Sequence, residues 1–376
     1  MWPLSSTRPK PLLPVVLGTS LLERWIEDVT DLVDEVIVVA SDERVAQKSE
    51  EMGAKVAYQR SGSGTAAAVK YGLEAARGDL LLIAYTDIYL QLPKNNLEEL
   101  LKRAPSILVK EVEDVSQFGA VIEEGGKVKK IVEKGMKGKG KIFAGVAVLK
   151  RKELEEGLKH LKPSPRGELE LTDLIPEQEP FAVTVKGFWK DVGRPWDIFD
   201  VVRAEFEVRE GLDNPWGPGK IYGEMPKVKG EVYIEGPAYF GKGVEVGPFA
   251  HVRPYSAFLD NVKVGSFVQV KNSYVMERSK IPHLNYVGDS VIAEDVNMGA
   301  GSVTANLRFD EKTIKVKLKG RTYDTGLRKL GAIIGGGARI GVNASLMPGV
   351  RVGARSWIYP GCVVHRDVMD GEKFKC

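Results

Sequence analysis

The chain has 376 residues, 43% of them apolar and 28% charged, and its formal net charge is +3. A chain of this length exceeds what one hydrophobic core usually serves, so we expect two domains. The near-neutral charge gives no reason to expect nucleic acid or an anionic membrane as partner, and no apolar run approaches the roughly 20 residues of a membrane span. Two cysteines cannot form a disulfide framework, and no signal-peptide pattern is present, so a reducing, cytoplasmic setting is expected.

Strand-like and helix-like stretches alternate in residues 1–210. Continuous apolar runs at 36–40 and 80–84 are typical of strands that are buried on both faces of a parallel sheet. Helices are expected between and after these runs, at 43–52, 65–76 and 195–210. The alternation predicts an α/β, Rossmann-like domain with a mostly parallel sheet.

A Gly- and Pro-rich linker at 211–226 ends this pattern, and the period of the apolar residues then changes to six. The two series at this spacing are Val228, Ile234, Phe240, Val246, Val252, Phe258, Val264, Val270 and Met276, and then Ile334, Ile340, Leu346, Val352, Ile358 and Val364. Hexapeptide repeats predict a parallel β-helix over 227–376, because stacked repeats bury a common core. A basic insertion at 307–330 breaks the period and is expected to project as a loop.

A distinctive motif lies between the two series. HLNYVGD at 283–289 is followed by GAGSVTAN at 299–306, and Arg253-Pro254 and Val270-Lys271-Asn272 stand upstream. Together these elements resemble the acetyltransferase domain of the bifunctional N-acetylglucosamine-1-phosphate uridylyltransferase/glucosamine-1-phosphate acetyltransferase family. The resemblance covers the whole C-terminal domain. It implies a left-handed β-helix and homotrimers with active sites between subunits.

The residue types suit acetyl transfer to an amine. Histidine, with an ordinary pKa of about 6.5, can take the proton of an amine at neutral pH, and His283 is the expected general base. By resemblance, Tyr286 and Asn306 position the sugar phosphate, and the fixed charges of Arg253 and Lys271 bind its phosphate.

Acetyl-CoA is expected at the glycine stretch and the basic insertion. The residues assigned to it are Gly299, Ala300, Gly301, Ser302, Lys312 and Lys329, with Lys315, Lys317 and Arg328 as further partners for its phosphates. Backbone N–H groups of the glycine stretch are expected to stabilise the oxyanion. A solvated basic loop remains the alternative interpretation of the insertion.

The N-terminal half resembles sugar-nucleotide pyrophosphorylases over about 200 residues. The matching stretches are PLSSTRPKP at 3–11, GSGTA at 62–66, Asp87, Glu133-Lys134, FAG at 143–145 and WKDVG at 189–193. The resemblance implies a nucleotidyltransferase site formed by Arg8, Lys10, Gly64, Thr65, Glu133, Lys134 and Gly145. Asp87 and Asp191 would hold Mg²⁺, whose shell substrate phosphates complete.

One element of the family pattern is missing. A Gly-rich loop that cradles the nucleoside triphosphate normally precedes the Pro-Leu stretch, whereas here Met1-Trp2 directly precede Pro3. Either the start is placed late, or this domain has lost nucleotidyl transfer. For the chain as printed, uridylyl transfer is expected to be weak or absent.

The leading hypothesis is acetyl transfer from acetyl-CoA to glucosamine-1-phosphate, in the synthesis of UDP-N-acetylglucosamine. The alternatives are a nucleotidyltransferase for glucose- or mannose-1-phosphate, with the β-helix only for assembly, and a non-catalytic regulatory paralogue. The choice between glucosamine and galactosamine, the nucleotide, and the roles of Cys362 and Cys376 stay open at this point.

Overall fold

The computed structural model describes residues 1–133, 135–165, 167–318 and 320–376, which form two compact units. Unit 1 combines Met1–Ser20 with Val192–Cys376, and unit 2 comprises Leu21–Asp191. In these ranges no helix is long and apolar enough to cross a membrane. The first twenty residues and the segment 192–210 thus belong to the unit that holds the predicted β-helix.

Unit 2 is built on a six-stranded sheet of order β3-β8-β5-β9-β7-β6. Its strands are β3 (Leu80–Ala84), β5 (Ser106–Val112), β6 (Gly119–Glu124), β7 (Lys127–Glu133), β8 (Gly140–Lys150) and β9 (Phe181–Thr184). Two further pairs are β1 (Ile37–Ala40) with β2 (Lys55–Tyr58), and β4 (Ile88–Leu90) with β10 (Trp189–Asp191). The predicted strands at 36–40 and 80–84 are confirmed as β1 and β3, but the expected burial on both faces is wrong for β3, whose residues are all exposed or partly exposed.

The expectation of a mostly parallel sheet is wrong for the six-stranded sheet. In it β5 and β9 are parallel, whereas β3, β5 and β6 each run antiparallel to β8. The reason lies in the connections: Gly125 and Gly126, both at positive φ, form a two-residue turn that folds β6 back on β7. Strands joined this way need no crossover helix, and the composition of the single strands did not show it.

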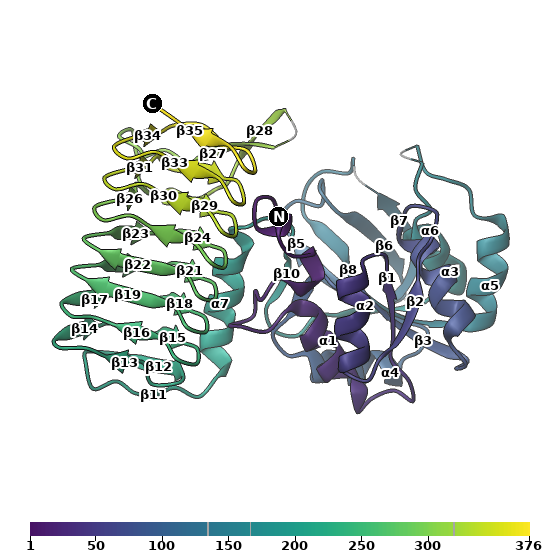
Figure 1. Cartoon of the computed structure of the whole chain (residues 1–376). Coiled ribbons are helices and arrows are strands. Elements are labelled where there is room, and N and C mark those ends of the chain that lie inside the picture. The colour runs from purple at the N-terminus through teal and green to yellow at the C-terminus, as the bar shows by residue number, and fades with distance from the viewer. Residues whose placement is uncertain (134, 166, 319) are drawn as a thin grey trace. The chain divides into compact units, whose positions relative to one another are not determined.

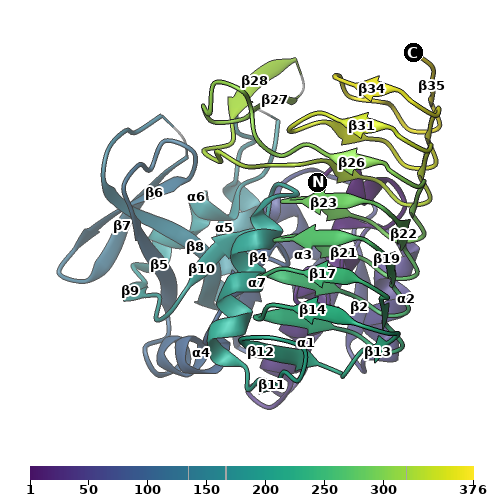
Figure 2. The same ribbon diagram turned by 90° about the vertical axis from the view of Figure 1, so that its left-hand side faces the viewer.

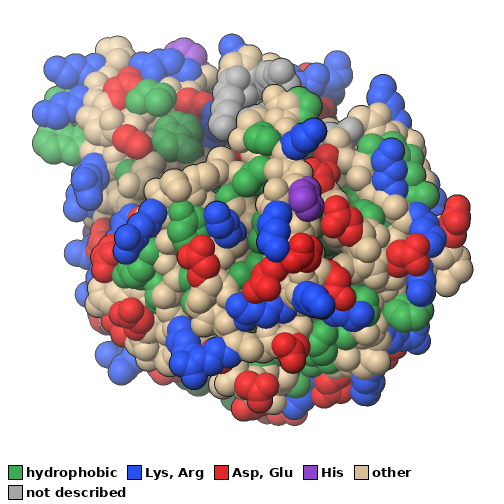
Figure 3. Space-filling view, turned by 90° about the vertical axis from the view of Figure 1, so that its right-hand side faces the viewer, with side chains coloured by type: hydrophobic (Ala, Val, Ile, Leu, Met, Phe, Trp, Pro, Cys, Tyr) green, Lys and Arg blue, Asp and Glu red, His purple; other side chains and the backbone are tan. Residues whose placement is uncertain are grey.

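The structure contains helices in both units. They are α1 (Leu21–Thr30), α2 (Glu43–Glu51), α3 (Thr65–Ala75), α4 (Pro93–Lys102), α5 (Arg151–His160), α6 (Leu171–Leu174) and η3 (Ile175–Gln178), and in unit 1 η1 (Leu4–Ser6), η2 (Lys10–Leu12) and α7 (Asp197–Val208). The three helices predicted at 43–52, 65–76 and 195–210 are confirmed as α2, α3 and α7. Acidic and basic side chains are interspersed on the face of the molecule that Figure 3 shows.

Unit 1 contains a left-handed parallel β-helix whose coils stack in a regular column (Figure 1). Each coil contributes one short strand to each of three faces. The first face holds β12 (Lys220–Gly223), β15 (Ala238–Phe240), β18 (Ser256–Phe258), β21 (Tyr274–Val275), β24 (Val291–Ile292), β29 (Ile333–Ile334) and β32 (Arg351–Val352), with β11 (Leu212–Asp213) at its edge. The second face holds β13 (Lys227–Val228), β16 (Glu245–Val246), β19 (Lys263–Ser266), β22 (Lys280–His283), β25 (Asn297–Met298), β30 (Arg339–Ile340), β33 (Trp357–Ile358) and β35 (Lys373–Phe374). The third face holds β14 (Val232–Ile234), β17 (Ala250–Val252), β20 (Gln269–Lys271), β23 (Tyr286–Gly288), β26 (Val303–Thr304), β31 (Ser345–Leu346) and β34 (Val363–Val364).

Apart from Val228 and Met276, the periodic apolar residues of both series belong to one core cluster, as the hexapeptide pattern predicted. One member is out of register: Phe258 pairs with Val275, so Met276 lies one position beyond the ladder. From there the coils shorten, because Val264 pairs with Ile281, seventeen residues later. The shorter coils explain why the six-residue period fades at this point although the β-helix continues.

The basic insertion forms a hairpin of β27 (Lys315–Leu318) and β28 (Arg321–Asp324), which stands out from the coils (Figure 2). Its base packs on the β-helix, where Ile314 is buried and Arg351 donates to the carbonyl of Lys317. The expected projecting loop is therefore confirmed as a hairpin with an anchored base.

Cys362 and Cys376, whose roles the sequence left open, form a disulfide with their Cα atoms 5.4 Å apart. Cys362 is fully buried at the start of β34, and β35 brings the chain back beside it. The pairing depends on the return of the last coil, which the number of cysteines did not reveal.

Candidate active sites

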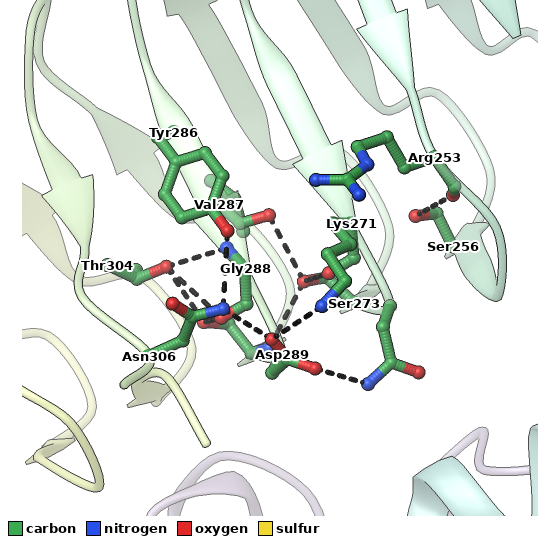
Figure 4. A network of polar contacts seen from close by, with 12 residues as sticks. Arg253, Ser256, Lys271, Ser273, Tyr286, Val287, Gly288, Asp289, Thr304 and Asn306 are labelled. Atoms are coloured by element: carbon green, nitrogen blue, oxygen red, sulfur yellow. Dashed lines mark hydrogen bonds and ion pairs between the residues drawn. The ribbon is translucent and has the colours of Figure 1, made fainter. Parts of the chain in front are cut away.

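Polar side chains gather at the corner where the strands of the third face end. Arg253 follows β17, Lys271 ends β20, Asp289 follows β23 and Asn306 lies two residues beyond β26. The register pairs Lys271 with Gly288, so these residues stack coil upon coil (Figure 4). The structure thereby brings together Arg253, Lys271 and Asn306, which the sequence assigned to the sugar phosphate.

The carboxylate of Asp289 is the centre of this corner and is only 4% exposed. Its Oδ1 accepts from Asn272 Nδ2 at 2.7 Å, and its Oδ2 accepts from Asn306 Nδ2 and lies 3.6 Å from Lys271 Nζ. Asn306 Nδ2 also lies 3.2 Å from the hydroxyl of Tyr286. A buried carboxylate with several donors holds each of them in one orientation. The sequence analysis gave no role to Asp289 or Asn272, although Asp289 is part of the HLNYVGD motif.

Gly288 makes this packing feasible. A Cβ atom there would lie 2.6 Å from the Tyr286 hydroxyl and 2.7 Å from Asn306 Nδ2. Any larger residue would therefore push the tyrosine and the asparagine apart.

His283 lies at the opposite edge of the third face, where the second face turns into it. It ends β22 and is exposed, and its backbone N–H donates to Asn285 Oδ1 at 3.0 Å. Tyr286 begins the next strand, and its side chain reaches Asn306 near the other edge. Within one chain, His283 and the Asp289 corner thus occupy the two ends of the same strands.

The glycine stretch at 299–302 forms the same corner one coil later. The N–H groups of Gly299, Gly301 and Ser302 donate to the carbonyls of Ile340, His283 and Gly299 at 2.7, 3.1 and 3.1 Å. Of the N–H groups expected to stabilise an oxyanion, those of Gly299 and Gly301 therefore already have carbonyl acceptors within the chain. A Cβ on Gly301 would lie 2.2 Å from Asn343 Oδ1, so close stacking of the coils by itself requires this glycine.

The basic residues assigned to acetyl-CoA lie on the insertion. Lys312, Lys315, Lys317, Arg328 and Lys329 are all exposed. Arg328 pairs with Glu311 at 2.5 Å, and a bridge between Leu307 and Lys329 joins the two ends of the insertion. Their exposure is compatible with a phosphate-binding role and with solvation alike.

The two predicted metal aspartates of unit 2 are neighbours. The register of β10 with β4 sets Asp191 opposite Ile88, the residue after Asp87. Carboxylate oxygens are the ligands that Mg²⁺ prefers, and Mg²⁺ commonly takes two of them with substrate phosphates. The donors therefore fit this ion, and no group of three or more metal-binding side chains exists among the described residues.

The substrate residues predicted in unit 2 converge around Tyr85. Burial raises the pKa of Tyr85, and the nearby carboxylates of Glu133, Glu170 and Asp87 act in the same direction. Thr65 Oγ1 accepts from the Leu171 N–H at 2.8 Å, and Glu133 accepts from the Thr172 hydroxyl at 2.9 Å. The first turn of α6 thus holds both of these predicted residues.

Two further predicted residues of unit 2 are glycines at tight contacts. A Cβ on Gly64 would lie 2.3 Å from the Leu169 carbonyl oxygen, and one on Gly145 would lie 2.6 Å from the Ile88 side chain. Lys134, predicted beside Glu133, lies outside the described residues.

Arg8 and Lys10 belong to unit 1, where the N-terminal segment is bound to the β-helix. Arg8 pairs with Glu277 at 3.0 Å, and Tyr274 accepts from the Gly18 N–H at 3.2 Å and donates to the carbonyl of Pro14. Lys10 lies in η2 of the same segment. Arg8 thus has a partner within its own unit, which the motif alone did not show.

Comparisons with known proteins cover both units of the chain. The family model for nucleotidyl transferases matches residues 1–207. A bifunctional sugar-1-phosphate nucleotidylyltransferase/acetyltransferase of Sulfurisphaera tokodaii is 39% identical, over 99% of this chain and 96% of that protein. The bifunctional protein GlmU of Methanocaldococcus jannaschii is 36% identical, over 97% and 92%. A solved structure, a putative glucose-1-phosphate thymidylyltransferase of Bacillus anthracis, is 20% identical with a TM-score of 0.48, over 56% of this chain and 92% of that one.

The family model matches more than half of the chain, and both relatives align with it over nearly its full length. The chain therefore belongs to the family of bifunctional sugar-1-phosphate nucleotidylyltransferase/acetyltransferases.

Proposed function

We propose that the β-helix unit transfers the acetyl group of acetyl-CoA to the amine of glucosamine-1-phosphate, a step toward UDP-N-acetylglucosamine. The observation that carries this proposal is the corner around Asp289, where Lys271, Tyr286 and Asn306 are held together in one network. A cation, a phenol and an amide suit a phosphorylated sugar, and a purely structural coil needs none of them.

In this proposal each group has one task. Arg253 and Lys271 bind the phosphate, and Tyr286 and Asn306 orient the sugar ring. His283 takes a proton from the amine, whose lone pair then forms the new C–N bond at the thioester carbon. The C–S bond breaks, and the thiolate of coenzyme A leaves and is protonated.

The Ala300 N–H is the oxyanion donor that we propose. In the described part of the chain no acceptor lies within hydrogen-bond distance of it, whereas Gly299, Gly301 and Ser302 all donate to carbonyls. An unpaired N–H at a corner between two glycines is free to donate to the developing charge on the thioester oxygen.

We propose further that the active assembly is a homotrimer with sites between copies. Beside His283, the same corner carries exposed apolar side chains on three successive coils: Phe249 (53%), Phe267 (60%) and Leu284 (63%). All three have positive φ, and the two phenylalanine rings stack at 5.2 Å. Such conformations cost on the order of 1 kcal/mol each for bulky residues, which contact with a second copy would offset. Because His283 and the Asp289 corner lie at opposite ends of the third face within one chain, we propose that a neighbouring copy supplies the Asp289 corner that faces His283.

We propose nucleotidyl transfer as a second activity, in place of the weak or absent activity expected from the missing Gly-rich loop; the adjacency of Asp87 and Asp191 in unit 2 favours it. Mg²⁺ bound there would neutralise charge on the phosphates during transfer. Thr65, Glu133 and Gly145 would position the nucleotide and the sugar beside it.

The test is thiol release from acetyl-CoA by the full chain, with glucosamine-1-phosphate present, omitted, or replaced by galactosamine-1-phosphate. We expect release only with an amino sugar phosphate, and a KM for it raised about tenfold or more in Lys271→Ala. No release from a folded oligomer would contradict the proposal and favour a regulatory protein. Pyrophosphate release from UTP in the presence of N-acetylglucosamine-1-phosphate, which accepts the uridylyl group, tests the second activity in the same preparation, with and without Mg²⁺.

A further inference from the structure

One buried column of the β-helix contains a residue that the fold does not require. In each coil, an inward-facing residue lies at the start of the strand of the third face or just before it. The register of these strands stacks the inward-facing residues of successive coils into one column. This column reads Ala250, Val268, Asn285, Ser302, Ala344 and Cys362. All are at most 2% exposed, and Asn285 is 1% exposed. Burying an amide is costly unless each polar atom is paired, and Val268 shows that an apolar side chain fills this column one coil earlier.

The amide of Asn285 is fully used. Its Oδ1 accepts from the His283 N–H at 3.0 Å. Its Nδ2 lies 2.8 Å from the Gly299 carbonyl oxygen, and 3.0 Å from both the carbonyl oxygen and the hydroxyl of Ser302. The side chain thus bonds to the corner at His283 through its oxygen and to the corner at 299–302 through its nitrogen.

These two corners carry the two halves of the proposed chemistry. The first holds His283, the proposed base, and the second holds the stretch from Gly299 to Ser302, with Ala300 as proposed oxyanion donor. A further bond, from the Gly301 N–H to the His283 carbonyl at 3.1 Å, joins the same two corners. Asn285 therefore fixes the spacing between base and acyl donor without contacting either substrate group.

We propose that Asn285 is a positioning residue for acetyl transfer, which sets His283 against the Gly299–Ser302 corner. This inference rests on the proposed function of the β-helix unit. Because the phosphate-binding corner at Asp289 does not involve Asn285, its loss should lower kcat and leave the binding of the sugar phosphate nearly unchanged.

The experiment compares Asn285→Ala and Asn285→Ser with the control Ser279→Ala. Serine already occupies the same column one coil later, so Asn285→Ser is expected to fold. Ser279 is equally buried and lies at the other end of β22, where its hydroxyl donates to Ala293 at 2.7 Å and accepts from Val296 at 3.0 Å. Its loss removes comparable bonds from the same coil without touching the corner of His283.

In Asn285→Ala we expect kcat to fall about 10- to 100-fold, because small displacements of a reacting group have effects of this size. The KM for glucosamine-1-phosphate should stay within about threefold of the wild-type value. Asn285→Ser should lose less, and Ser279→Ala should keep the wild-type kcat. Hydrogen exchange of peptides covering 281–304 should rise in Asn285→Ala and not in peptides covering 333–348.

Three results separate the two proposals. An active wild type whose Asn285→Ala keeps full kcat overturns the positioning role alone. An equal loss of kcat in Ser279→Ala also overturns it, because the effect is then one of coil stability. A wild type without sugar-phosphate-dependent thiol release overturns the proposed function, and unchanged exchange at 281–304 in Asn285→Ala would then refute the structural link as well.

Discussion

The two units build their sites in different ways. In the β-helix, Lys271, Asp289 and Asn306 follow one another at intervals of one coil, so neighbours in space are 17 or 18 residues apart. In unit 2, Asp87 and Asp191 meet through β4 and β10, and Glu133 meets Thr172 through the start of α6. A solenoid turns a spacing in the sequence into a stacked site, whereas an α/β unit assembles its site from strand ends that are far apart in the chain.

The largest expected effect tests whether the two sites act independently. His283→Ala should lower acetyl transfer by about 10³-fold, because the general base is lost, and should leave pyrophosphate release unchanged. The control is His365→Ala, because His365 is exposed and directly follows β34. Loss of both activities in His283→Ala would contradict independent sites, since the two units would then depend on each other.

The reciprocal change is Asp191→Asn in unit 2. Loss of one of two carboxylates should reduce Mg²⁺-dependent pyrophosphate release by about 10²-fold or more, and EDTA should have the same effect on the wild type. Acetyl transfer should be unaffected by either treatment. Asp34→Asn, at an exposed position of the same unit, should change neither rate; an acetyl-transfer defect in Asp191→Asn would refute the separation of the sites.

The disulfide sharpens the comparison, because it closes a loop in the β-helix alone. Cys376→Ser should lower the free energy of unfolding of that unit by about 3 kcal/mol, as expected for a loop with a sequence separation of 14. The measurement is thermal unfolding of wild type and variant with and without dithiothreitol. Reductant should lower the wild-type midpoint to that of the variant; an unresponsive wild type would mean that the bond does not form.

Asp289→Asn tests the corner that carries the proposed function. The substitution places an amide where the side chains of Asn272 and Asn306 donate hydrogen bonds, and it removes the negative charge that pairs with Lys271. The KM for the sugar phosphate should therefore rise about tenfold. Asp295→Asn, which breaks the exposed pair with Arg278 on a neighbouring coil, is the matched control. Equal kinetics in the two variants would show that the Asp289 network is structural only.

The smallest effect is expected at the N-terminal segment. Arg8→Ala removes a pair with side chains 25% and 20% exposed, which is worth at most about 1 kcal/mol. Faster hydrogen exchange in residues 1–20, with unchanged acetyl transfer, is the expected result. Arg44→Ala, which breaks an exposed local pair with Asp42, serves as the control; a lost acetyl-transfer rate in Arg8→Ala alone would contradict a purely structural role.

Sequence analysis was most successful where the chain repeats. The spacing of six identified the β-helix. The motifs supplied Lys271, Tyr286 and Asn306 as candidates, which lie together in the structure because each coil stacks directly on the last. It failed for the sheet of unit 2, where strands rich in Val and Ile are parallel or antiparallel according to their connections. It also missed Asp289 and Asn285, whose importance lies in contacts with other coils.

The sequence by itself therefore determined the class of each unit and the family, and it supplied the residues proposed for both sites. Only the tertiary structure decided that Arg8 pairs with the β-helix, that the Gly301 N–H donates to the carbonyl of His283, and that Cys362 forms a disulfide with Cys376. The physical reason is the same in each case. A local pattern fixes which way a side chain points, whereas its hydrogen-bond partner depends on which distant segment packs against it.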